Sequence, residues 1–262
     1  MGVMNATSAI TLPFWMILAL FGTGLVAGFV DAIAGGGGLI TLPVMLSVGL
    51  PAQLALGTNK LQATFGSGSA TWHYAKCGVV SLPECRRGVL FTFLGAAAGT
   101  WLVQQQDPAF LKHFIPIILL AVVGYVLWRP ELGAADIHPR MSPGTFYAVL
   151  GLGLGFYDGF LGPGTGSFWT MAFMLGLGFN LTKATGFTKV MNFTSNVVSF
   201  VFFAVAGNVH YAAGLSMGAG QLIGAKVGSG MVVTRGTKFV RPVFITMVLA
   251  VTLKLLYDAF QK

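Results

Sequence analysis

Long apolar stretches run along almost the whole chain and alternate with short connections rich in polar residues, glycine and proline. They predict transmembrane helices, because a hydrocarbon core about 30 Å thick takes roughly 20 helical residues per crossing. Ten segments are predicted, at residues 13–34, 39–56, 61–75, 88–104, 110–128, 144–161, 167–180, 187–206, 212–233 and 240–260. The second, third and seventh are short or interrupted, which leaves open full crossings or re-entrant segments. We therefore expect about 8–10 transmembrane segments.

The composition supports this class of protein. Of the 262 residues, 55% are apolar and only 8% are charged. So few charges cannot cover a soluble globule, whereas a membrane protein needs polar surface only at two rims and around an internal path. The sequence therefore predicts an all-α polytopic membrane protein with little mass outside the bilayer.

Three glycine-containing motifs occur twice in the same order. The first copies are Gly28–Asp31 with Gly35–Gly38, then Gly57–Lys60, then Gly95 with Gly99; the second copies are Gly155–Asp158 with Gly162–Gly166, then Gly186–Lys189, then Gly224 with Gly228. The offset is 127 residues for the first motif and 129 for the others. This pattern predicts two transmembrane repeats of roughly 129 residues, at 1–128 and 144–262, joined by a polar linker at 129–143.

The basic residues indicate orientation. The net charge is +8, but the lysines and arginines are scattered between apolar segments, which argues against nucleic-acid binding. If all ten segments cross, ten basic residues, Lys189 among them, lie on one side and four, including Lys60, on the other. The positive-inside rule places the first side and the linker in the cytoplasm and both termini in the periplasm. Five crossings per half would invert the second repeat, and transporters of that design bind substrate near the midplane.

The glycine runs are candidates for a ligand site. Gly35–Gly38 cannot sustain a lipid-exposed helix, because each glycine costs about 1 kcal/mol relative to alanine and leaves amides bare. At a helix start, such amides and the helix dipole suit a phosphate, sulfate, sulfonate or carboxylate. The alternative is that glycines permit close helix crossings, which is our interpretation of Gly24 with Gly28 and of the ladder Gly220, Gly224 and Gly228.

Two acids and two lysines occupy matched positions in the repeats. Asp31 and Asp158 are interpreted either as proton carriers or cation partners, or as structural acids that cap the next helix. Lys60 and Lys189 either supply the two positive charges of an anion site or extend to the membrane interface. The predicted substrate-binding set is Gly35, Gly36, Gly37, Gly38, Thr58, Asn59, Lys60, Gly162, Gly164, Thr165, Gly166, Thr188, Lys189 and Asn192.

No arrangement of residues indicates catalysis or a metal centre. Cys77 and Cys85 have neither CxxC nor zinc-finger spacing, and the four histidines are dispersed. No nucleophile–base pair is found at helical spacing. We therefore expect no enzyme activity, no metal and no cofactor.

The paired motifs, with Gly28–Asp31, Gly35–Ile40 and Gly57–Lys60 in the first copy, resemble those of the TauE/SafE family of membrane permeases over essentially the whole chain. The second copy departs, with Pro163, Thr165 and Phe187 in place of Gly36, Gly38 and Thr58. The resemblance implies transport of sulfite, sulfoacetate, thiosulfate or other organic anions across the bacterial inner membrane, often outward.

We therefore predict an alternating-access exporter of sulfite, an organosulfonate or a related small anion. An anion channel, or a permease for another organic anion, remains the alternative. The expected partners are the small anionic substrate, the lipid bilayer and a second copy of the chain in a homodimer.

Overall fold

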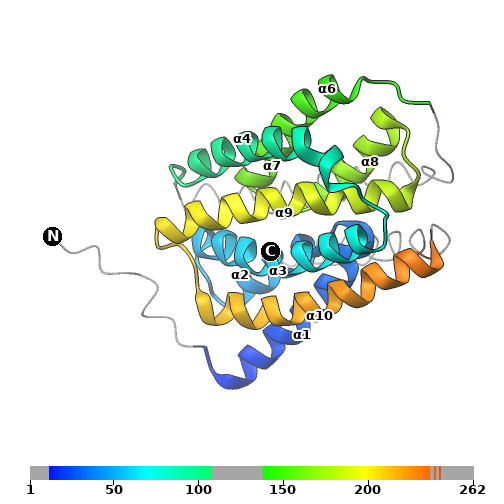
Figure 1. The fold of residues 1–262 in the computed structure, drawn as a ribbon. Coiled ribbons are helices and arrows are strands. Elements are labelled where there is room, and N and C mark those ends of the chain that lie inside the picture. The colour runs from blue at the N-terminus through cyan, green and yellow to red at the C-terminus, as the bar shows by residue number, and fades with distance from the viewer. Residues whose placement is uncertain (1–11, 108–137, 237–238, 240–241, 243–262) are drawn as a thin grey trace, which may run out of the picture.

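The structure is a computed structural model that describes residues 12–107 and 138–236 together with residues 239 and 242, and this part of the chain is helical without strands (Figure 1). The predicted segments 110–128 and 240–260, both termini, His113 and most of the linker at 129–143 lie outside the described residues.

The described part of the first half forms four α-helices. They are α1 (Phe14–Ala34), α2 (Gly37–Ser47), α3 (Ala52–Lys76) and α4 (Arg86–Val103), with a 3-10 turn, η2 (Leu82–Cys85), before α4. Only Gly35 and Gly36 separate α1 from α2. Gly35 has φ 75°, and its N–H donates to the carbonyl of Asp31 at 2.8 Å. Glycine adopts this left-handed conformation without strain, so α1 ends there and the chain turns into α2.

The second half contains helices of similar lengths and order. The short α6 (Pro143–Phe146), a π-helical turn η3 (Tyr147–Gly151) and α7 (Leu152–Phe160) follow one another without a gap, and α8 (Thr165–Leu177), α9 (Leu181–Val205) and α10 (Tyr211–Arg235) complete the described chain. The break between α7 and α8 contains Gly162 and Gly164, whose φ angles are 95° and 81°.

The predicted boundaries were wrong at the two longest central helices. The predicted segment 39–56 combines α2 with the first turn of α3, and the segment from residue 61 starts nine residues too late, since α3 begins at Ala52. Likewise, α9 begins at Leu181 and not at residue 187. Polar residues in the first turns, such as Asn59 and Lys60, suggested connections, but their side chains are buried against polar partners within the protein.

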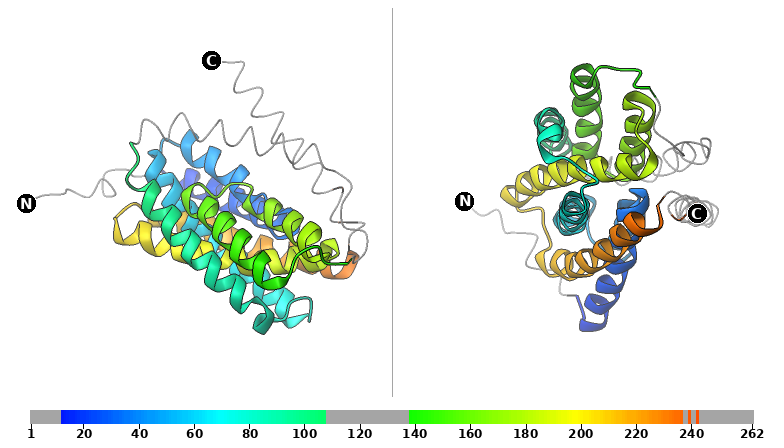
Figure 2. Two further views of the ribbon diagram at one scale, coloured as in Figure 1. Left: turned by 90° about the horizontal axis from the view of Figure 1, so that it is seen from above. Right: turned by 45° about the vertical axis from the view of Figure 1, so that its right-hand side comes forward.

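Helices α3 and α9 run side by side through the centre of the molecule (Figure 1). In the right-hand view of Figure 2, α4, α7 and α8 lie on one side of α9, and α1 and α10 lie on the other. The outer pairs combine the two halves, because α1 packs chiefly on α10 and α7 chiefly on α4. The halves therefore interlock.

Glycines allow the close backbone contact in both outer helix pairs, α1–α10 and α4–α7, which confirms the packing interpretation of the glycine ladders. A Cβ at Gly24 would overlap the carbonyl of Met217 in α10, and one at Gly224 would overlap the carbonyl of Leu25 in α1. In the α4–α7 pair, Gly95 and Gly99 lie against the carbonyls of Leu152 and Phe156 in the same way. Two helix backbones approach this closely only where side chains are absent.

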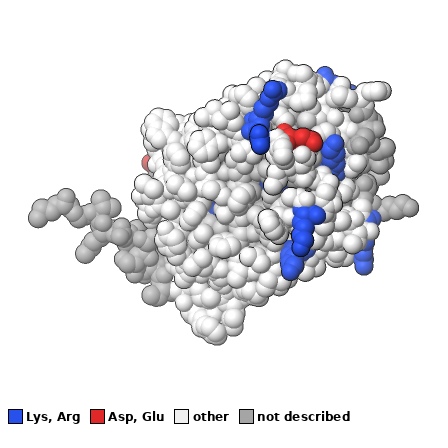
Figure 3. Space-filling view, viewed as in Figure 1, with Lys and Arg blue, Asp and Glu red and all other residues white. Residues whose placement is uncertain are grey.

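The described surface is mostly apolar around the bundle and basic at one end. By length and composition, α1 and α9 are the two described helices that could each cross a membrane. Basic side chains at the helix ends gather at one end of the bundle, on the right in Figure 3: Lys76, Arg86, Arg87, Arg140, Lys183 and Arg235. This distribution is typical of a membrane protein with one basic rim.

Candidate functional site

The N-termini of α2 and α8 meet in the interior. A Cβ at Gly35 would overlap the backbone of Gly166, and Ser167 Oγ donates to the carbonyl of Ala34 at 2.9 Å. The N-cap residues, Gly36 and Gly164, have no side chain to cap their helices. The positive ends of two helix dipoles therefore converge here. Several of the first amides already have local acceptors: Gly37 N–H donates to Asp31 Oδ1, and Thr165 N–H donates to the carbonyl of Gly162.

A polar cavity of about 30 Å³ lies between these helix starts. It is lined by Asp31, Gly35, Gly37, Gly38, Asn59, Lys60, Ala63, Asp158, Gly162, Gly164, Thr165, Gly166, Asn192, Asn196 and Gln221. Ten of the predicted substrate-binding residues and both predicted acids are therefore brought together from positions far apart in the sequence. The volume suits one or two water molecules.

Four predicted site residues do not line the cavity. Gly36 is the N-cap of α2. Thr58 Oγ1 accepts from the backbone N–H of His210 at 2.9 Å, and the hydroxyl of Thr188 lies 3.1 Å from that of Thr170. Lys189 also lies outside the lining. The two threonines thus connect helices and do not face the cavity.

Lys60 forms a buried ion pair with Asp158. Its Nζ lies 2.7 Å from Asp158 Oδ1, and the two side chains are only 1% and 5% exposed. The same ammonium donates to the backbone carbonyl of Asp158, and Ser195 Oγ donates to the second carboxylate oxygen. The alternative interpretation, in which Lys60 extends to the membrane interface, is therefore wrong, because the lysine is buried and its charge is compensated inside the protein.

Lys189 forms the second ion pair, with Asp31. Nζ of Lys189 lies 2.9 Å from Asp31 Oδ2, and the side chains are 0% and 17% exposed. The other carboxylate oxygen, Oδ1, accepts the backbone N–H of Gly37 at 3.1 Å. Asp31 thus caps the first turn of α2, as expected of a structural acid, and it is also the partner of a cation, Lys189. Lys189, like Lys60, does not extend to an interface.

The two ion pairs cross between the halves of the chain. Lys60 of the first half binds Asp158 of the second, and Lys189 of the second half binds Asp31 of the first. Removing one partner of a buried pair typically costs 3–5 kcal/mol, because the other charge is left uncompensated. Both lysines lie within helices and not in the connections between them. The count of basic residues that predicted the orientation therefore loses one residue on each side of the membrane, and the same side still carries more of them.

Sequence reasoning left three polar residues of this region out of the site. Ser195 holds the carboxylate of Asp158, while Asn196 and Gln221 line the cavity. Gln221 Oε1 and Asn192 Oδ1 are buried without a hydrogen-bond partner among the described residues. The available signal for Gln221 was its place directly after Gly220, because a polar side chain on a helix-packing face needs a partner or a ligand.

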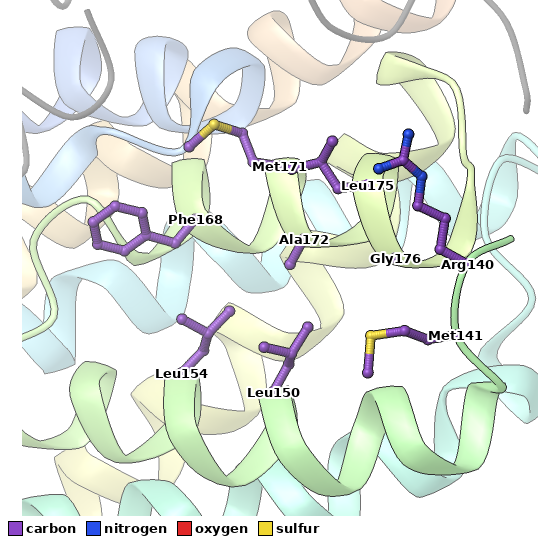
Figure 4. A pocket seen from close by; sticks show the side chains of 9 residues that line it. All are labelled: Arg140, Met141, Leu150, Leu154, Phe168, Met171, Ala172, Leu175 and Gly176. Carbon is purple, nitrogen blue, oxygen red and sulfur yellow. The ribbon is translucent and has the colours of Figure 1, made fainter. Parts of the chain in front are cut away.

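A larger cavity, of about 540 Å³, lies between α7 and α8 (Figure 4). Leu150 and Leu154 face it from one side and Phe168 and Met171 from the other, with Arg140 at one end. Its lining is apolar apart from Arg140. It therefore offers few donors to an anion, and the candidate functional site is the smaller polar cavity.

Comparison with known proteins gives consistent matches over nearly the whole chain. The family described as "Sulfite exporter TauE/SafE" matches residues 20–255. A "Probable membrane transporter protein" of Haemophilus influenzae is 45% identical over 243 residues, covering 93% of this chain and 95% of that protein. "Probable membrane transporter protein ORF9" of a Sinorhizobium species is 43% identical, covering 94% of this chain and 95% of the relative. "Probable membrane transporter protein YfcA" of Escherichia coli K12 is 42% identical, covering 92% and 89%. No solved structure matches the chain.

Proposed function

Because the chain belongs to the TauE/SafE family, we propose that it exports sulfite, an organosulfonate or a related small oxyanion by alternating access. The names of its relatives indicate a membrane transporter and not an enzyme. The proposed location is the bacterial cytoplasmic membrane.

The observation that carries this proposal is the convergence of two helix N-termini and the Lys60 ammonium on one polar cavity. Backbone N–H groups at helix starts bind the oxygens of sulfur oxyanions, and the amides of Asn59 and Asn192 add directional donors. Each hydrogen bond to a charged group contributes about 1.5–3 kcal/mol. These donors suit an anion with several oxygens, and the two carboxylates that also line the cavity, Asp31 and Asp158, are each paired with a lysine.

The closed cavity favours a carrier over a channel. A channel requires a continuous wet pore, whereas this site holds about 30 Å³ and two buried ion pairs connect the helices around it. An oxyanion needs more space than this, so the helices must separate to admit it. A site that opens and closes in this way supports alternating access.

The arrangement of the helices also supports two inverted repeats, at residues 1–128 and 144–262. The starts of α2 and α8 face each other, the outer helices exchange partners between the halves, and both ion pairs cross. Inverted repeats place a substrate site at the junction of the two halves. The basic end of the bundle is proposed to face the cytoplasm, where the negative membrane potential favours outward movement of an anion.

Thermal unfolding of the purified protein tests the proposal. A ligand at 100 times its Kd stabilises the folded state by about 2.7 kcal/mol. Sulfite and methanesulfonate are expected to raise the unfolding temperature above that in chloride at equal ionic strength. The proposal is contradicted if no sulfur oxyanion does so.

A further inference from the structure

The two ion pairs differ in their relation to the cavity, although their sequence positions match. Lys60 and Asp158 both line it, whereas only Asp31 of the second pair does so and Lys189 lies outside. The second pair is also held in place because Asp31 accepts the backbone N–H of Gly37 and thereby caps α2. The two lysines therefore cannot have equivalent roles toward a ligand in the cavity.

The carboxylate of Asp158 occupies two donors that suit an oxyanion. One of its oxygens accepts from the ammonium of Lys60 at 2.7 Å, and the other accepts from the hydroxyl of Ser195. A charged donor and a hydroxyl serve equally well for a carboxylate, a sulfite or a sulfonate, because all present acceptor oxygens with negative charge. Two donors that suit the substrate are thus already bound to an anion of the protein itself.

We infer that Asp158 is an internal competitor of the substrate, and that the transported oxyanion binds by replacing its carboxylate at Lys60. This inference rests on the proposed function. Gly162 makes such an exchange sterically feasible, because a Cβ there would lie 2.6 Å from Lys60 Nζ and 2.9 Å from Asp158 Oδ1. Without that methyl group, the cavity reaches the ion pair itself.

The exchange would connect binding to movement of the two halves. Lys60 belongs to α3 of the first half and Asp158 to α7 of the second, so the ion pair joins elements of both halves. Replacing the carboxylate with a free anion removes this connection and leaves Lys189–Asp31 in place. A ligand shifts a conformational equilibrium only through such a difference in its interactions with the two states.

Binding measurements on Asp158→Asn in the full-length protein test the inference. Asparagine keeps the size of the side chain and removes the competing charge, and the backbone carbonyl of residue 158 can still hold the Lys60 ammonium. We expect the Kd for methanesulfonate, measured by calorimetry, to fall roughly tenfold, a difference of about 1.4 kcal/mol. The gain is expected to disappear in Lys60→Met/Asp158→Asn.

Asp31→Asn is the matched control for the general effect of removing a negative charge from the cavity. If Asp158 competes directly, Asp31→Asn changes the Kd less than Asp158→Asn does. Equal tightening in both variants, or no tightening in Asp158→Asn, overturns the inference.

A second variant, Asp158→Ala, tests the inference if Asp158→Asn fails to fold. Asp158→Ala leaves Lys60 without its carboxylate and vacates the space of that group, so acetate or methanesulfonate is expected to raise its unfolding temperature more than that of the wild type. An Asp158→Ala protein that neither anion stabilises contradicts the inference.

These outcomes separate the two proposals. If the wild type binds oxyanions but Asp158→Asn binds them no more tightly, only the internal competition is wrong. If neither protein binds any sulfur oxyanion, the proposed function itself fails.

Discussion

Nζ of Lys60 lies 2.7 Å from Oδ1 of Asp158, although 98 positions separate the two residues in the sequence. The corresponding lysine of the second half, Lys189, binds Asp31 across 158 positions. Four charges that look like isolated intramembrane residues are thus two neutral pairs. Among the described residues, both lysines of the proposed anion site are thus paired, and under our proposal substrate binding changes at least one pair.

The pairing predicts a non-additive effect on stability. Lys189→Met leaves the carboxylate of Asp31 without its cation in the interior and is expected to destabilise the protein by about 3–5 kcal/mol. Lys189→Met/Asp31→Asn removes both charges and should recover much of that loss. Unfolding curves of the four proteins of this cycle measure the coupling. A double variant as unstable as Lys189→Met would contradict the pairing.

The cavity lining predicts that the two lysines differ in ligand binding. Lys60→Met/Asp158→Asn, which is neutral and removes the ammonium from the cavity, should weaken sulfite binding by about 1.5–3 kcal/mol, roughly ten- to hundredfold. Lys189→Met/Asp31→Asn should weaken it less, because Lys189 is outside the lining. Calorimetric titration of the folded variants gives both values. Equal losses would mean that the lysines act as equivalent charges.

Gly38→Ala tests whether the glycines serve the ligand. A Cβ at Gly38 would lie 3.3 Å from Pro163 Cα and 3.7 Å from Asn59 Nδ2, so the fold can accept it with small shifts while the cavity loses space. We expect transport to fall at least tenfold and the stability to change by only about 1 kcal/mol. The matched control is Gly22→Ala in α1, where nothing lies within 4 Å of the added methyl.

Normal transport by Gly38→Ala would indicate that this glycine serves helix packing and not ligand binding. Gly164→Ala is the less informative substitution. Its φ of 81° is strained for alanine, so a loss of transport there would also reflect loss of stability.

The native cysteines report the orientation of the basic end. Cys77 follows α3 at this end and is exposed, whereas Cys85 is buried. Burial, with the charge of Glu84, raises the pKa of the Cys85 thiol to about 12, so little reactive thiolate forms there at pH 7–8. A membrane-impermeant maleimide should therefore label Cys77 in inside-out vesicles and not in intact spheroplasts. Labelling from the periplasm would reverse the proposed orientation, and Cys77→Ser is the control.

The apolar pattern was sufficient to predict helices whose outer surface is apolar. The segments expected at 13–34 and 212–233 agree closely with α1 and α10. It failed at the starts of α3 and α9, because hydropathy counts Asn59 and Lys60 as polar whether or not partners elsewhere in the fold satisfy them. When the polar residues of a helix are buried against partners from other helices, the local hydropathy pattern does not show where that helix starts.

The repeat predicted most of the cavity lining, since the matched glycines and acids do meet there. It did not predict which lysine faces the cavity. Lys60 and Lys189 have the same spacing from their motifs, and only the packing of α3 and α9 distinguishes them. The sequence also could not predict that the two ion pairs cross between the halves, because matched charges allow pairs within a half as readily as between halves.

Sulfite flux through the purified protein in liposomes tests the central claim most directly. The wild type is expected to show saturable uptake of labelled sulfite into sulfite-loaded vesicles, reduced by methanesulfonate, and Lys60→Met/Asp158→Asn is expected to lose most of it. Wild-type flux no greater than that of protein-free liposomes, or full flux in the folded double variant, would contradict a sulfur-oxyanion carrier with its site at Lys60.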